Sequence, residues 1–398
     1  MDDRSRQLIS SSAGATIPAA RLSSFYFAYY AALGAFTPYW SLYLKSRGMD
    51  VAAISVLMSL WYATRIVAPS TWTTLAAHSA RPIRWLQLGC LLTLGTFAAL
   101  LLPLEFAGLF AVMCAFCFAY NAVMPQFESI TMSHLGARAD LYGRIRVWGS
   151  VGFITVVALF GVLLDRFGVD TLPWLMLPLF VGLLVSSFFN GYAHPVEEPH
   201  DENHVGFRAR LKQPQVIAFF SAAFLAQLSF GPYYTFFSIY LSEHQYSATM
   251  LGGFWSVGVL AEIAVFFLSS RIFRRWDPGT VLVYALLSAA LRWWVTALWP
   301  DNIALMVAAQ LTHALNFGAF FAAAMQLLVR FFPGRMNGHG QGVFYGLSSG
   351  VGGVVGALAA GQLWRFGGNV AFLVSGCVAL VSAAIAWYWL ARTTVTKR

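Results

Sequence analysis

The sequence predicts an all-α membrane protein with twelve transmembrane helices, arranged as two six-helix halves. The 398 residues are 59% hydrophobic and only 10% charged, whereas a soluble globular chain is roughly 25% charged. Apolar runs recur along the chain at the length of about 20 residues that a helix needs to cross a bilayer. These runs are continuously apolar and do not alternate with polar residues, which favours helices over a membrane β-barrel.

The predicted spans fall into two groups according to how cleanly they are apolar. Runs without any Asp, Glu, Lys or Arg cover 22–44, 85–104, 106–127, 171–193, 213–242, 302–329, 336–364 and 366–391. Shorter or singly interrupted runs fill the gaps at 51–77, 147–164, 247–270 and 278–300. Together they give twelve spans, and an even number places both ends of the chain on the same side of the membrane.

The basic residues indicate which side that is. Taking the N-terminus as cytoplasmic, nineteen of the 25 Lys and Arg residues fall on the cytoplasmic side. The opposite side receives only Lys45, Arg47, Arg166 and Arg365. This bias is the one that orients membrane proteins, so we expect an inner-membrane protein with both termini in the cytoplasm. It also accounts for the net charge of +9 without a nucleic-acid partner.

Segment 194–212, the one long hydrophilic connection, divides the chain into a tail at 1–20, halves at 21–193 and 213–392, and a tail at 393–398. The halves look alike, because aligning Tyr43-Leu44 on Tyr240-Leu241 places Arg65 opposite Glu262. The sequence therefore predicts a six-plus-six duplication, and in transporters built this way the substrate site lies near the midplane between the repeats.

Charged residues inside the spans are the strongest functional signal. A charge at the bilayer centre costs at least about 2.5–3.5 kcal/mol, so it persists only with a partner or in a wet cavity. Arg65 is interpreted as a cavity-lining cation, the alternative being a purely structural pair. Glu262, with Trp255 seven residues earlier on the same helix face, is suited to binding substrate or a proton. Arg292 is its expected partner.

Polar and aromatic side chains on single helix faces extend this set. Gln310, His313 and Asn316 are spaced three apart, which indicates a polar stripe on one helix. Glu128 and Arg146 are expected at similar depths, either as a functional pair or as an interfacial salt bridge. The residues predicted to line a cavity are Trp40, Trp61, Asn121, Phe153, Gln227, Tyr234, Trp255, Gln310 and Asn316.

Motifs of other protein classes are missing from the sequence. The chain has no GxxxxGK[ST], HExxH or GxSxG segment, and only three lysines. We therefore expect neither an enzyme nor a protein that uses a cofactor or metal, and the energy for uphill transport is expected to come from a proton gradient.

The chain resembles the major facilitator superfamily over essentially its full length after residue 20. Its nearest resemblance is to the phenylpropionate permease group, carried by Pro38-Tyr-Trp-Ser-Leu-Tyr-Leu-Lys45, Ala63-Thr-Arg65, Tyr142-Gly-Arg-Ile-Arg-Val-Trp-Gly-Ser150, Ala261-Glu262 and Leu291-Arg292-Trp293. It is more distantly similar to lactose permease. That resemblance implies that Glu128 and Arg146 bind substrate as a pair, and it matches Glu262, Arg292 and His313 to functional positions.

Two departures from lactose permease matter for function. Phe153 stands where that family has a sugar-stacking tryptophan, and Asn316 stands where it has a proton-carrying glutamate. The first weakens the expectation of a galactoside substrate. The second means that Glu262 or Glu128 must carry the proton, or that the coupling differs.

The predicted function is proton-coupled symport of a small organic solute by alternating access, with an aromatic carboxylate such as phenylpropionate favoured. Sugar or nucleoside symport and drug efflux by proton antiport are alternatives within the same class. A membrane-embedded enzyme and a non-transporting sensor are the alternatives from other classes. The expected partners are a small-molecule substrate and the lipid bilayer, and the expected working unit is a monomer.

Overall fold

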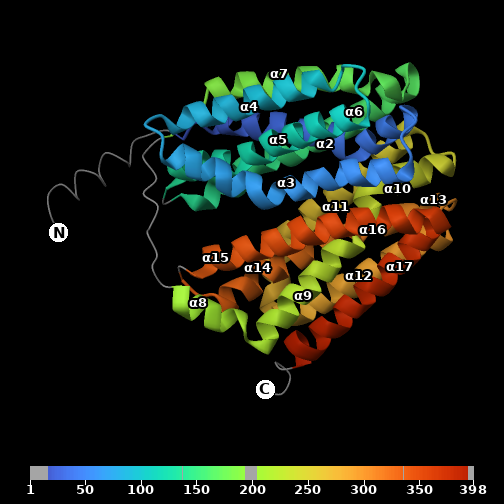
Figure 1. Cartoon of the computed structure of the whole chain (residues 1–398). Coiled ribbons are helices and arrows are strands. Elements are labelled where there is room, and N and C mark those ends of the chain that lie inside the picture. The colour runs from blue at the N-terminus through green and yellow to red at the C-terminus, as the bar shows by residue number, and fades with distance from the viewer. Residues whose placement is uncertain (1–16, 137, 193–203, 335, 393–398) are drawn as a thin grey trace.

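The computed structural model describes residues 17–392 apart from 137, 193–203 and 335 (Figure 1). Every element formed by these residues is helical. Figure 1 shows two bundles, one running from blue to green and the other from yellow-green to red. The predicted tails at 1–20 and 393–398 and the predicted central loop lie largely outside the described residues.

The first bundle contains six spans. They are α2 (Ala19–Ser46), α3 (Val51–Ala77), α4 (Pro82–Ala99), α5 (Phe106–Leu135), α6 (Tyr142–Phe167) and α7 (Leu172–Phe188), with short turns η1 (Ala139–Leu141) and η2 (Val169–Thr171). We call this bundle the N-terminal half.

The second bundle, the C-terminal half, also contains six spans, several of them built from more than one helix. They are α9 (Pro214–Ser229) with α10 (Gly231–Glu243); α11 (Ala248–Arg275); α12 (Pro278–Leu298); α13 (Ile303–Leu311) with η3 (Ala314–Ala319) and α14 (Phe320–Phe331); α15 (Met336–Phe344) with η4 (Tyr345–Gly352), α16 (Gly353–Leu363) and η5 (Trp364–Phe366); and α17 (Gly368–Ala386) with η6 (Trp387–Ala391). The segments η3, η4 and η6 are π-helical.

Ten spans among the described residues are long and apolar enough to cross a membrane. The remaining two long helices are α2, which carries five tyrosines, and α4, whose first turns hold Arg84 and Gln87. These polar groups lower the hydropathy of α2 and α4 without preventing a helix of spanning length. With them the fold has the twelve spans that the sequence predicts.

Part of the segment predicted as a loop at 194–212 is a helix, α8 (His204–Leu211). It is fixed to the C-terminal half, because Arg210 Nη1 donates to the carbonyl of Phe331 at the end of α14, at 2.9 Å. The ring of Phe207 lies 5.1 Å from that of Phe332. A polar connection therefore contains a docked helix, stabilised by an arginine at a helix C-terminus.

Equivalent helices of the two halves pack in the same way. In the N-terminal half α2 contacts α6 and α7, and α3 contacts α5; in the C-terminal half α9 and α10 contact α16 and α17, and α11 contacts α13 and η3. Close approach depends on glycine: a Cβ on Gly152 would overlap the Phe27 backbone, and one on Gly356 would overlap the Leu228 carbonyl. Small residues permit such contacts between membrane helices.

The halves meet along α3 with α16, α6 with α11, and α2 with α10. At one end of this seam the Asp165 carboxylate accepts from the backbone N–H groups of Ala248 and Thr249, at 2.7 and 2.9 Å. Tyr39 and the pair Lys45–Glu243 add further contacts across the seam at the same end. We call this the sealed end.

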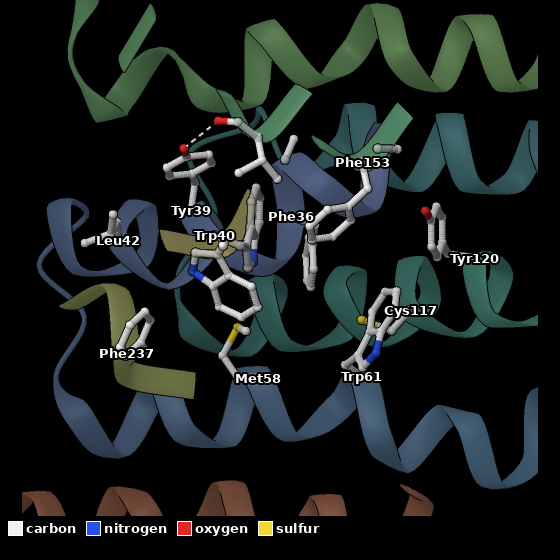
Figure 2. Close-up of a cluster of buried hydrophobic side chains, with 14 of the residues drawn as sticks. Phe36, Tyr39, Trp40, Leu42, Met58, Trp61, Cys117, Tyr120, Phe153 and Phe237 are labelled. Atoms are coloured by element: carbon white, nitrogen blue, oxygen red, sulfur yellow. Dashed lines mark hydrogen bonds between the residues drawn. The ribbon is translucent and has the colours of Figure 1, made fainter. Parts of the chain in front are cut away.

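Aromatic side chains fill the N-terminal half beside the seam. Phe36 stacks between Trp40 and Trp61, with ring centroids 5.4 and 5.2 Å away. Figure 2 shows these rings together with Met58 and with Phe237, which comes from α10 of the other half. The seam is thus apolar and ring-rich next to the midplane.

Candidate functional site

The most buried charge of the described residues is Arg292 on α12, whose side chain is 1% exposed. Its Nη2 donates to Gln310 Oε1 at 2.6 Å, and its Nη1 donates to Asn316 Oδ1 at 3.2 Å. Nη1 also lies 2.9 Å from His313 Nδ1. The polar stripe predicted on the tenth span therefore faces Arg292 and surrounds it with neutral acceptors.

Aromatic rings cover the faces of this guanidinium group. Arg292 Cζ lies 4.2 Å from the ring centroid of Tyr233 and 4.8 Å from that of Trp293. Such contacts stabilise a desolvated cation by about 2 kcal/mol or more. The Tyr233 hydroxyl donates to Gln310 Oε1 at 3.2 Å, and its ring lies 4.6 Å from that of Trp255.

His313 connects Arg292 to Glu262. An arginine side chain only donates hydrogen bonds, so His313 Nδ1 must accept from Arg292 and the ring proton must sit on Nε2. His313 Nε2 faces Glu262 Oε2 at 3.7 Å. The prediction that Arg292 pairs directly with Glu262 is therefore wrong: among the described residues, no arginine lies within 4.0 Å of Glu262, and its carboxylate faces the neutral histidine that lies between them.

Two glycines and a change of helix type bring these groups together. Gly258 on α11 faces the side chain of His313, and Gly318 on η3 faces that of Glu262. His313 immediately precedes the π-helical segment η3, which contains Asn316. A π-helical turn widens the helix, and such turns are frequent at functional sites.

A second cluster in the N-terminal half is built around Glu128 on α5. Tyr26 Oη donates to Glu128 Oε2 at 2.7 Å, and Tyr142 Oη donates to Oε1 at 3.1 Å. Arg146 Nε lies 3.8 Å from Oε1, and the two charged side chains are 27% and 31% exposed, Arg146 first. Arg146 Cζ sits 3.9 Å from the Tyr30 ring centroid. The structure thus places the predicted Glu128 and Arg146 side by side.

Arg65 belongs to neither cluster. Its side chain is exposed midway along α3, and its Cζ lies 5.7 Å from the ring of Trp61. Among the described residues no carboxylate lies within 4.0 Å of it.

The predicted cavity-lining residues divide into packed and partly open positions. Asn121 is buried and donates to the Trp61 carbonyl and to Thr64 Oγ1, both at 2.9 Å, so it ties α5 to α3. Trp40 and Phe153 are buried, and no described residue accepts from the Trp40 indole N–H. Gln227 and Tyr234 are half-buried, and Tyr234 stacks on Phe230.

Sequence reasoning missed the tyrosines that complete both clusters. Tyr26 and Tyr30 are four residues apart on α2, and Tyr142 is four residues before Arg146 on α6. That spacing puts each pair on one helix face, which was the available signal. Tyr233, which follows Pro232, carried no comparable signal.

The twelve-span fold is the one that the resemblance implied, and the chain is a membrane transporter of the major facilitator superfamily. More narrowly, the chain belongs to the MFS_1 like family, whose model matches residues 19–374.

Relatives and solved structures agree with this family. The chain is 26% identical over 359 residues to a probable 3-phenylpropionic acid transporter of Escherichia coli (strain K12), covering 89% of this chain and 93% of that protein. It is 25% identical to the maltose permease of Geobacillus stearothermophilus, over 86% and 88% of the two chains. The crystal structure of the nucleoside transporter NupG superposes with a TM-score of 0.80 at 16% identity, over 94% and 98%. The family and these neighbours are transporters, which are not enzymes.

Proposed function

We propose that the protein is a symporter that carries a small aromatic carboxylate, such as phenylpropionate, together with a proton. The observation that carries this proposal is an imbalance of charge. Three arginines within the spans, Arg65, Arg146 and Arg292, are proposed to face the substrate pathway, and among the described residues only Arg146 has a carboxylate within 4.0 Å. A cation within a span requires a partner or a water-filled cavity, and a carboxylate substrate can supply a partner of opposite charge.

The rings around the arginines support an aromatic substrate. Arg65 lies beside Trp61, and Arg292 lies beside Tyr233 and Trp293. Flat rings offer a stacking surface to an aromatic solute, and its carboxylate can accept a bidentate pair of hydrogen bonds from a guanidinium group. The similarity to a probable 3-phenylpropionic acid transporter points to the same chemistry.

The proton is proposed to reside on Glu262. Its side chain is 18% exposed and faces His313 Nε2, whose other ring nitrogen contacts Arg292. Protonation of Glu262 removes the negative charge that His313 faces. This chain of contacts links the proton site to Arg292, so the occupancy of one site alters the electrostatics of the other.

Transport is proposed to follow alternating access of the two halves. With both termini in the cytoplasm, the sealed end lies on the outer side, and Glu128 and Arg146 lie toward the cytoplasm. Their partial exposure fits a site that opens inward while the sealed end is closed. Opening outward requires the contacts of the sealed end to break.

The test is uptake of labelled phenylpropionate into proteoliposomes that contain the purified protein. We expect accumulation when the interior is alkaline, and little accumulation of the neutral analogue 3-phenylpropan-1-ol. A monocarboxylate moving with one proton carries no net charge, so a membrane potential imposed without a pH gradient is expected to drive nothing. Equal accumulation with and without the pH gradient would contradict proton coupling.

Sugar or nucleoside symport remains the second candidate. The similarity of the chain to a maltose permease and to a putative nucleoside transporter supports it. Uptake of maltose or uridine in the same vesicles, without uptake of phenylpropionate, would favour this candidate.

A further inference from the structure

A groove of about 490 Å³ lies between the end of α11 and the start of α12, away from the site described above. Apart from two arginines, Arg271 and Arg275, its lining is apolar. The other lining side chains include Leu268, Trp276, Tyr284, Ala285, Leu315 and Ala319. The last two belong to η3, which forms the floor between the two helices. Pockets of this size hold small organic molecules or parts of larger ones.

The groove opens on the lipid-facing surface. Leu268, Tyr284 and Leu315 are exposed, whereas Ala285 and Ala319 are buried and form its base. Trp276 and Tyr284 meet edge to face, with ring centroids 5.9 Å apart. In a membrane protein an exposed apolar surface within a span faces acyl chains, and Trp and Tyr gather at the level of the lipid headgroups. The groove therefore runs from headgroup level into the hydrocarbon.

The two arginines at the rim have no acidic partner in the part of the chain that the structure describes. Arg271 and Arg275 are exposed, and among the described residues no carboxylate lies within 4.0 Å of either. The nearby Asp277 is already engaged, since it accepts from Arg330 Nη2 at 2.8 Å and caps Gly279 N at 2.9 Å. The rim thus presents two positive charges, four residues apart on α11, above an apolar channel.

We propose that this groove binds an anionic phospholipid, with its phosphate on Arg271 and Arg275 and an acyl chain along Leu268 and Leu315. Basic pockets between transmembrane helices bind anionic headgroups through this combination of charge and apolar contact. A neutral lipid would satisfy the apolar wall but not the two guanidinium groups. A free phosphate ion would satisfy the arginines but leave the wall uncovered.

The groove shares two structural elements with the proposed transport site. The floor of the groove is the π-helical segment η3, and its other face carries Asn316 beside Arg292. α11, which forms one wall, carries Glu262 six residues before Leu268. A bound acyl chain therefore lies against α11, which carries Glu262, and against η3, which directly follows His313. The spacing of these two elements sets the distance between Glu262 and His313.

Native mass spectrometry of the full chain in detergent tests the proposal, with palmitoyl-oleoyl phosphatidylglycerol or the matching phosphatidylcholine added. Each arginine near an anionic headgroup strengthens binding by about fivefold, so the double variant R271Q/R275Q is expected to bind phosphatidylglycerol about 25-fold more weakly. R274Q is the matched control, because Arg274 is exposed on the same helical turn but does not line the groove. L268W fills the groove with both arginines intact and is expected to weaken binding too.

Three results would overturn the lipid site. One is equal binding of phosphatidylglycerol and phosphatidylcholine by the unchanged protein. Another is a loss in R274Q as large as in R271Q/R275Q, which would indicate general surface charge. The third is displacement of the lipid by millimolar inorganic phosphate, which would indicate a site for the ion alone. If R271Q/R275Q does not fold, unchanged lipid binding in L268W contradicts the proposal on its own.

Discussion

The two halves differ in the burial and in the partners of their charged side chains. In the N-terminal half, Glu128 and Arg146 face each other directly, are about a third exposed, and are supported by tyrosine hydroxyls. In the C-terminal half, Arg292 is almost fully buried and is held by neutral oxygens, a histidine and two aromatic rings, while Glu262 contacts the histidine instead.

This difference indicates that the two similar halves have different roles in transport. An ion pair that is already neutral and solvated changes little when an anion or a proton arrives. Arg292 is different, because its buried guanidinium group has no carboxylate partner and is connected through one imidazole to Glu262. The electrostatic environment of this group therefore changes strongly when an anion binds or when Glu262 takes up a proton. Within the proposed function, we therefore assign proton coupling and the binding of the substrate carboxylate at Arg292 to the C-terminal half, and additional contacts with the substrate to the N-terminal half.

The sharpest test of this division is E262Q. We expect it to abolish accumulation of substrate against a gradient, because no proton can then move with the substrate; for one proton per substrate the loss is about tenfold for each unit of imposed pH difference. Exchange of labelled for unlabelled substrate across the vesicle is expected to persist. The measurement is uptake in proteoliposomes with and without an alkaline interior.

E128Q is the matched control in the other half. It should weaken substrate binding and leave the dependence on the pH gradient intact. If E128Q removed that dependence while E262Q kept it, the assignment of the two halves would have to be reversed.

The next largest effect is expected for R292K. A lysine keeps the charge but loses the planar fork that is proposed to hold the substrate carboxylate with two hydrogen bonds. Hydrogen bonds to a charged group contribute about 1.5–3 kcal/mol each, so KM should rise by about 30-fold. Initial rates over a range of substrate concentrations measure this, and R146K, at the solvated pair, should change KM less. Equal effects at both positions would mean that burial does not distinguish them.

A smaller effect is expected for the tyrosine donors. Y26F removes the 2.7 Å hydrogen bond to Glu128 but leaves Tyr142 as a donor, so substrate affinity should fall by about threefold to tenfold, as for one net hydrogen bond. Calorimetric titration of the purified protein with substrate measures it. The double variant Y26F/Y142F should lose more than the sum of the single losses if the two hydroxyls share one carboxylate.

The smallest effect concerns the place where the halves join. Lys45 and Glu243 pair at 2.7 Å, but their side chains are 43% and 46% exposed, and such a surface pair contributes about 0.2–1 kcal/mol. K45E should therefore speed labelling of cysteines introduced near the sealed end by no more than about fivefold. The swap K45E/E243K should restore the original rate, and failure to do so would mean that the pair does not help hold the end closed.

The spans could be predicted from the sequence, because crossing a membrane requires apolar runs of about 20 residues and such runs can be read directly from the sequence. The pairing of Glu128 with Arg146 was also available, since both lie near helix ends on one side. The partner of Glu262 was not. His313 reaches its place between Glu262 and Arg292 because α11 and η3 approach at Gly258 and Gly318, and neither this approach nor the π-helical turn has a signature in helical periodicity.

Asn121 shows a second case in which the role of a side chain could not be predicted from the sequence. A buried amide on an apolar helix is equally typical of a cavity wall and of a tie between helices, and only the hydrogen bonds to α3 distinguish them. The tyrosine donors to Glu128 come from α2 and α6, so their convergence depends on how three helices pack. Such positions follow from tertiary packing and not from local pattern.

The sealed end carries an energetic consequence for the transport cycle. The first turn of α11 is capped by two side chains at once. Asp165, from the N-terminal half, accepts from Ala248 N and Thr249 N, while Ser247 accepts from Met250 N at 3.3 Å within its own half. When the halves separate, Ser247 stays in place and water can replace Asp165. Because losing a helix cap costs about 0.5–2 kcal/mol, the contact biases the resting conformation by only a few multiples of thermal energy. A carrier must visit both conformations in every cycle, and a bias of this size allows frequent visits to each.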